Sequence, residues 1–305
     1  MNHRLRRFLL GNNEKSGFLS RFVIYFVLIG LGFVYIYPVL YMLTTSLMNT
    51  RDLVDATVTW IPRQLSAEGF RKASATLDFW PRLRDSVIMS VLPALLQTAS
   101  LAISGYGLAR FRVPLKGMWF GFIILVFLIP SAVTLIPRYM LFNGYHLVGT
   151  VWPSFLTAAL GQGVKSSVFL LVYYQFFGAY PKALDEAAQI DGASVVRVFL
   201  RIALPMAIPA IVVTFLFSFI WLWNETTQLS LLSGTAINTL PMALEAFTDS
   251  FDKLYPANDV SAGGALNESI RMAGTLLSIA PLMAVYLCLQ KTFIQSVERS
   301  GITGE

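Results

Sequence analysis

The chain has 305 residues, of which 55% are hydrophobic and 13% are charged, and it carries a formal net charge of +6. Soluble globular domains carry about 25% charged residues, so the composition excludes an ordinary soluble protein and predicts an integral membrane protein. The basic residues are scattered at the ends of apolar runs, so we expect no nucleic-acid partner. At those positions they help to orient a chain in the lipid bilayer.

Six apolar segments are long enough to cross a bilayer as helices, which takes about 20 residues each. In chain order they cover residues 22–43, 86–109, 118–137, 152–176, 202–223 and 272–290. The sequence lacks the alternation of membrane β-strands, so we predict an all-α integral membrane fold with six transmembrane helices. The predicted membrane domain covers residues 22–292.

Lys and Arg near the segment ends predict the orientation of the chain. They concentrate in the N-terminal segment, residues 1–21, in the links after the second and fourth segments, and in the C-terminal tail, residues 293–305. Basic residues favour the cytoplasmic side, so we expect both termini there. The first apolar run is too long for the hydrophobic region of a cleavable signal peptide. Two loops would be external: residues 47–85 as an ordered cap, and residues 226–269 with one short helix. The first loop also holds six basic and five acidic residues, which conflicts in part with this assignment.

The sequence predicts neither a catalytic site nor a metal site. Cys288 is the single cysteine, and the two histidines lie far apart, without Cys or Glu neighbours at metal-binding spacing. The nearest match to a phosphate loop begins at Gly161, but Val164 stands where the pattern requires glycine. We therefore expect a chain that is not an enzyme and holds no cofactor. If ATP drives its function, ATP and Mg bind to partner subunits.

The link between the fourth and fifth segments has the most regular pattern of charge. Pro181 suits the first turn of a helix, and the sequence KALDEAAQI that follows it consists of strong helix formers. Asp191 and Gly192 end this helix, because glycine adopts the left-handed conformation of a C-terminal cap. Ser194 can cap a second helix that runs to Pro205. The pattern predicts a short polar helix, a glycine turn and a second, more hydrophobic helix.

This link also carries a family signature. The sequence reads Glu-Ala-Ala from Glu186, then Gly192 after three residues, then Ile-Ala-Leu-Pro after nine more. At every defined position it resembles the EAA motif of ABC-importer permeases, although an ordinary amphipathic surface helix is the alternative. The resemblance implies that residues 178–205 are a coupling segment that docks on an ATP-binding subunit. The coupling residues would be Glu186, Ala187, Ala188, Asp191, Gly192 and Pro205.

Looser similarities extend the resemblance over most of the chain. Residues 106–114, 128–137, 221–225 and 290–293 resemble corresponding segments of sugar-type permeases. The chain thus resembles the smaller, six-span permease of a maltose-type carbohydrate importer, with a type I importer fold, in the inner membrane of a bacterium. Permeases of this type can place their C-terminal end, here residues 295–305, near the ATPase dimer.

The family resemblance also implies partners. They are a second homologous permease, two ATP-binding subunits, and an external solute-binding protein that delivers the carbohydrate. We expect this carbohydrate to be an oligosaccharide, and in one interpretation an acidic one. Two alternatives stay open: an importer permease for a non-sugar solute, and a secondary transporter.

Two polar groups are candidates for the translocation pathway. Lys165 interrupts the fourth apolar segment, and a charge in the hydrocarbon by default faces the bundle interior or water. Gln162 and Ser166 lie on about the same helix face. A boundary lysine that reaches outward is an equal alternative. The second group lies at the external end of the fifth segment and comprises Asn224, Glu225 and Gln228. It suits either a hydroxyl-rich ligand or solvent.

Overall fold

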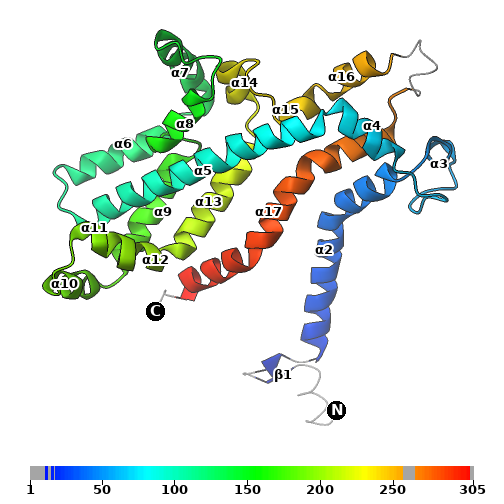
Figure 1. Cartoon of the computed structure of the whole chain (residues 1–305). Coiled ribbons are helices and arrows are strands. Elements are labelled where there is room, and N and C mark those ends of the chain that lie inside the picture. Colours follow the sequence, from blue (N-terminus) through cyan, green and yellow to red (C-terminus); the bar gives the residue numbers. More distant parts are fainter. Residues whose placement is uncertain (1–10, 13–14, 17, 257–264, 303–305) are drawn as a thin grey trace. The chain divides into compact units, whose positions relative to one another are not determined.

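A computed structural model describes residues 11–12, 15–16, 18–256 and 265–302. Apart from a two-residue antiparallel pair, β1 (Gly11–Asn12) and β2 (Lys15–Ser16), its regular structure is helical (Figure 1). The predicted all-α class is confirmed. The expected role of residues 295–305 concerns side chains that lie outside the described part of the chain.

The helices belong to two compact units. One comprises Met1–Ser74 with Tyr255–Leu277, and the other comprises Ala75–Leu254 with Ser278–Glu305. Three helices are long and apolar enough to cross a membrane. They are α2 (Phe18–Ser46) in the first unit, α5 (Phe79–Arg110) in the second, and α17 (Glu268–Ile302), which contributes to both. They cover the first, second and sixth predicted segments.

Two further predicted segments are bent. α6 (Lys116–Leu128) and α7 (Ser131–Gly144) meet at an angle of 100°, at a break that contains Pro130. The chain between Val195 and Met206 meets α13 (Ile208–Trp223) at 74°. If each bent pair is one span, length and composition give up to five spans in the described residues, against the six that we predicted.

The fourth predicted segment, residues 152–176, is not one helix. α8 (Trp152–Ala159) and α9 (Ser166–Ala179) are separated by residues 160–165, which we call the unwound segment. The prediction of a continuous span was wrong because Gly161 adopts a left-handed φ of +67°, and Lys165 one of +55°. Glycine costs a helix about 1 kcal/mol relative to alanine, and this segment has two glycines within three residues.

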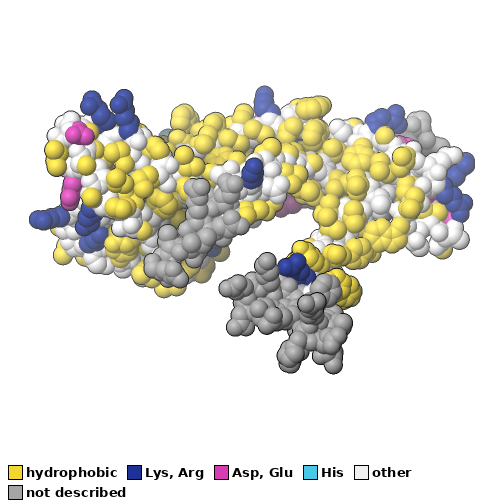
Figure 2. All heavy atoms as spheres, turned by 90° about the horizontal axis from the view of Figure 1, so that it is seen from below, with side chains coloured by type: hydrophobic (Ala, Val, Ile, Leu, Met, Phe, Trp, Pro, Cys, Tyr) yellow, Lys and Arg dark blue, Asp and Glu magenta, His cyan; other side chains and the backbone are white. Residues whose placement is uncertain are grey.

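The core of the second unit lies where α5 packs along α9 and α13. Gly105 lets α5 approach α9 closely, since a Cβ there would lie only 2.5 Å from the Cβ of Tyr173. Buried aromatic side chains, including Phe169 and Phe177, fill the neighbouring space. Hydrophobic side chains also cover much of the surface visible in Figure 2, as expected for a protein surrounded by lipid.

Both long loops are ordered over much of their length. In residues 47–85 the structure has α3 (Thr50–Val54) and α4 (Glu68–Thr76), and the carboxylate of buried Asp52 accepts a bond from the Arg63 backbone N–H at 3.1 Å. This agrees with the predicted ordered cap.

The expectation of one short helix in residues 226–269 was wrong for the described part. It holds α14 (Thr227–Ser233), α15 (Leu240–Glu245) and α16 (Phe247–Leu254), while residues 257–264 lie outside the description. These helices are short but bury apolar side chains such as Leu240 and Phe251.

Candidate functional site

The predicted coupling helix is present as α10 (Lys182–Ile190). Pro181 precedes its first residue, and Gly192 follows its end with a left-handed φ of +81°. The Oγ of Ser194 accepts a bond from the Arg197 backbone N–H at 3.4 Å and caps α11 (Val195–Val198). The predicted helix, turn and cap are therefore confirmed.

The helix after the glycine turn differs from the prediction. A π-helix, η1 (Phe199–Ala203), follows α11 and leads into α12 (Leu204–Met206), which contains Pro205. The predicted end of the helix at Pro205 was wrong, because the bend comes after Met206. Pro205 lacks the backbone N–H that a helix would bond to the carbonyl four residues back. The N–H of Leu204, the residue before it, donates to the Phe199 carbonyl five residues back, as in a π-helix.

The outer surface of the coupling segment is unusually apolar for an exposed helix. Ile190 is 86% exposed and Val196 is 65% exposed, while Leu184 and Leu200 are also exposed. Glu186 and Ala187 are exposed beside them, and Ala188 is half-buried. Apolar side chains interspersed with a carboxylate and small residues form a surface that suits a protein partner.

The opposite side of α10 is held by a buried polar cluster. We call Arg110, Tyr180 and Asp185 the α5–α10 anchor. The hydroxyl of Tyr180 donates to Oδ1 of Asp185 at 2.5 Å, and Nε of Arg110 lies 3.3 Å from Oδ2 of Asp185. Burial raises the pKa of Tyr180 above its ordinary value, and the bond to the Asp185 carboxylate raises this pKa further. The phenol therefore stays protonated and donates to the carboxylate.

The unwound segment is held by polar side chains from two neighbouring helices. Nε2 of Gln97, a fully buried side chain of α5, donates to the Val164 carbonyl oxygen at 2.8 Å. From α7, Nη2 of Arg138 donates to the Gln162 carbonyl oxygen at 3.1 Å. Backbone groups that lost their helical partners are thus satisfied by side chains, as an interruption within a membrane helix requires.

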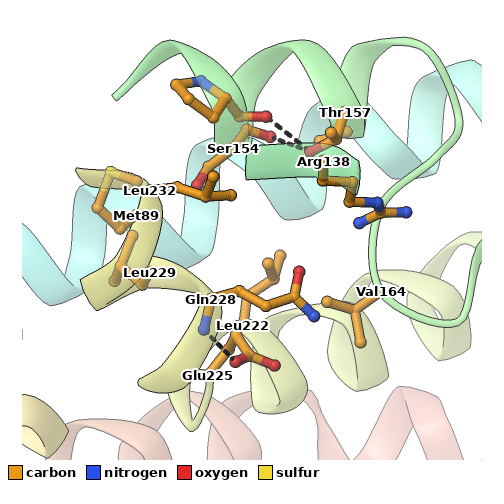
Figure 3. Close-up of a pocket in the computed structure, with 13 residues that line it drawn as sticks. Met89, Arg138, Ser154, Thr157, Val164, Leu222, Glu225, Gln228, Leu229 and Leu232 are labelled. Atoms are coloured by element: carbon orange, nitrogen blue, oxygen red, sulfur yellow. Dashed lines mark hydrogen bonds between the residues drawn. The ribbon is translucent and has the colours of Figure 1, made fainter. Parts of the chain in front are cut away.

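A small pocket lies beside the unwound segment (Figure 3). Arg138 enters it from one side, and Glu225 and Gln228 enter it from the other, among apolar residues such as Leu222 and Leu229. Its volume of about 40 Å³ holds a few water molecules but no sugar ring. Within the described residues, Arg138 forms no ion pair.

The predicted pathway residues divide between two settings. Lys165 and Gln162 are exposed on the unwound segment, whereas Ser166 is buried and its hydroxyl donates to the Gly163 carbonyl at 2.7 Å. Asn224 is exposed, and its amide donates to the Ile220 carbonyl at 2.8 Å. Of the six predicted pathway residues, Glu225 and Gln228 line the pocket. There the Gln228 backbone N–H donates to the Glu225 carboxylate at 2.9 Å.

Five residues that organise these sites were not predicted as site residues from the sequence: Gln97, Arg110, Arg138, Tyr180 and Asp185. A signal was present for Gln97, because a single amide within an apolar segment requires a polar partner. The described residues hold no group of three or more side chains that could bind a metal ion.

Residues 99–299 match the family of binding-protein-dependent transport system inner membrane components. The chain belongs to this family. Among its relatives is the putative ABC transporter permease protein ORF2 of a Caldicellulosiruptor species, 29% identical over 270 residues, or 88% of this chain and 91% of that protein. The diacetylchitobiose uptake system permease protein DasC of Streptomyces coelicolor is 25% identical over 88% of this chain and 92% of its own length.

A solved structure supports the fold of this family member. A chain of a bacterial ABC transporter involved in the import of the acidic polysaccharide alginate superposes with a TM-score of 0.73. The superposition covers 92% of this chain and 99% of that one, at 18% sequence identity. The predicted resemblance to ABC-importer permeases and the type I permease fold are confirmed.

Proposed function

We propose that the chain is the smaller, six-span permease subunit of an ATP-driven importer that translocates an oligosaccharide. The coupling segment carries this proposal, because it presents the EAA pattern on an exposed helix of a membrane permease. Relatives named for sugar transport support the choice of solute. They include DasC and two proteins named for the transport of starch degradation products and of sulfoquinovosyl glycerol.

The importer would contain several partners around this chain. A second homologous permease completes the pathway, an external solute-binding protein delivers the carbohydrate, and two ATP-binding subunits hold ATP and Mg. This chain then needs no cofactor of its own. Both termini lie on the cytoplasmic side of the bacterial inner membrane. The exposed apolar residues of the coupling segment dock on an ATP-binding subunit.

The unwound segment is the part of this chain that best suits contact with the solute. Discontinuous membrane helices commonly place backbone groups and helix ends at the binding sites of transporters. The exposed ammonium group of Lys165 and the guanidinium of Arg138 favour a carboxylated or sulfonated saccharide, while Glu225 and Gln228 can bond to hydroxyl groups. The small pocket volume is consistent with a pathway that the second permease completes.

Purification of the tagged chain from its native membrane tests the proposal. Mass spectrometry should find a second permease, an ATP-binding subunit at two copies, and a bound oligosaccharide. Ile190→Asp should reduce the yield of the ATP-binding subunit, because it places a charge in an apolar interface. Thr227→Asp, at an exposed position of α14, is the matched control and should leave that yield unchanged. Absence of an ATP-binding subunit from the wild-type preparation would contradict the proposal.

A further inference from the structure

The α5–α10 anchor joins two helices through one arginine. The side chain of Arg110 is 5% exposed and that of Asp185 is 11% exposed. In addition to the ion pair, Nη2 of Arg110 donates to the Tyr180 carbonyl oxygen at 2.8 Å, and its Cζ lies 3.6 Å from the centre of the Tyr180 ring. Arg110 therefore fixes the corner between α9 and α10 through charge, backbone and ring contacts at once.

The position of this ion pair is more informative than its strength. Burying two charges costs solvation energy, so a buried pair stabilises a fold no better than apolar residues of similar size. All residues of α10 are described, and Asp185 is the one that is buried. The rest of the helix surface is exposed or half-buried. The fold thus places a costly polar contact at the one buried residue of α10.

The covalent route from the C-terminal end of α10 into the membrane domain is irregular. It passes through the turn at Gly192, then through the π-helix η1 and the bend after Met206. Glycine permits a wide range of backbone conformations, and π-helical turns are rare and often functional. At the other end of α10, Tyr180 and Pro181 join the helix to α9. A contact with α5 would limit rotation of α10 about these two covalent links.

The anchor supplies that contact with α5. We propose that Arg110 is a positioning residue, which through Asp185 fixes α10 to α5 so that a displacement of α10 moves α5 as a rigid body. Asp185 directly precedes Glu186 of the EAA motif. α5 also packs along α9 and α13, and near its middle Gln97 holds the unwound segment. This inference rests on the proposed docking of α10 on an ATP-binding subunit.

The number of solute molecules transported per ATP hydrolysed, measured on the complete reconstituted complex, tests the role of Arg110. Arg110→Met removes the charge at similar length and should lower this ratio at least ten-fold. Arg110→Lys keeps the charge but not the planar stack on Tyr180, so it should give an intermediate ratio. Arg112→Met removes an exposed charge two residues away and should match the wild type. A wild-type ratio in Arg110→Met would overturn the inference.

A double variant separates coupling from folding. Arg110→Met alone leaves the Asp185 carboxylate buried without its cation, which can lower the amount of assembled complex. Arg110→Met with Asp185→Leu removes both charges and should restore co-purification of the ATP-binding subunit while the transport ratio stays low. A double variant that transports normally per ATP, or one that still fails to assemble, would overturn the positioning role. A wild-type complex that takes up solute without hydrolysing ATP would instead contradict the proposed function.

Discussion

At the residue scale, two glycines are required for different physical reasons. Gly105 is buried in α5, where a Cβ would meet both the Cβ and the backbone of Tyr173. Gly192 lies in open space, with no neighbouring heavy atom within 4 Å of the place that a Cβ would occupy, but its φ is +81°. The first glycine permits close helix packing, and the second permits a left-handed turn.

We expect Gly105→Ala to destabilise the protein. The added methyl group cannot fit without separating α5 from α9, and overpacking of this kind costs about 1–3 kcal/mol. The midpoint of thermal unfolding of the purified protein should therefore fall. Gly107→Ala, on the same helix with no neighbour within 4 Å, is the matched control and should leave the midpoint unchanged or raise it slightly. Equal midpoints for the two variants would contradict the close contact.

Substitutions of Gly192 should follow backbone preference and not side-chain size. Asn adopts left-handed conformations readily, whereas a β-branched residue there costs about 1–2 kcal/mol or more. We expect Gly192→Asn to retain most ATP-driven uptake. In Gly192→Val the uptake rate should fall about 5–30-fold, which corresponds to a free-energy cost of about 1–2 kcal/mol. Similar uptake by the two variants would show that the left-handed turn is not needed for coupling.

At the scale of elements, the sequence predicted helices with clear local signals and missed the interruptions. Pro181, Gly192 and Ser194 lie at the ends of helices as expected, because caps and turns depend on a few adjacent residues. The break at residues 160–165 depends on Gln97 and Arg138, which are distant in sequence. Apolar composition alone is the same for a continuous and a broken span, so hydropathy could not separate them.

Thiol labelling tests the exposure of the unwound segment. In a Cys288→Ser background, Lys165→Cys should react with a charged, water-soluble thiol reagent, and bound oligosaccharide should slow the reaction. Ser166→Cys, the adjacent residue, is buried and should react far more slowly. If Lys165→Cys stays unreactive in every transport state, Lys165 does not face an aqueous pathway.

At the scale of the whole molecule, the orientation in the membrane follows from the basic residues and remains a prediction. The coupling segment and α14 should lie on opposite sides of the bilayer. Ile190→Cys, in the coupling segment, should react with a membrane-impermeant reagent only when the cytoplasmic side is open. Thr227→Cys, on α14, should react from outside in intact cells with a permeable outer envelope. Labelling of both cysteines from the same side would overturn the predicted topology.

The central claim is that ATP hydrolysis by partner subunits drives solute through this permease. Its most direct test is uptake of labelled oligosaccharide by proteoliposomes that contain the complete complex and its solute-binding protein. We predict that uptake requires ATP on the side of the coupling segment, and that it persists when ion gradients are dissipated. Uptake that proceeds without ATP and follows an ion gradient would identify a secondary transporter and contradict this claim.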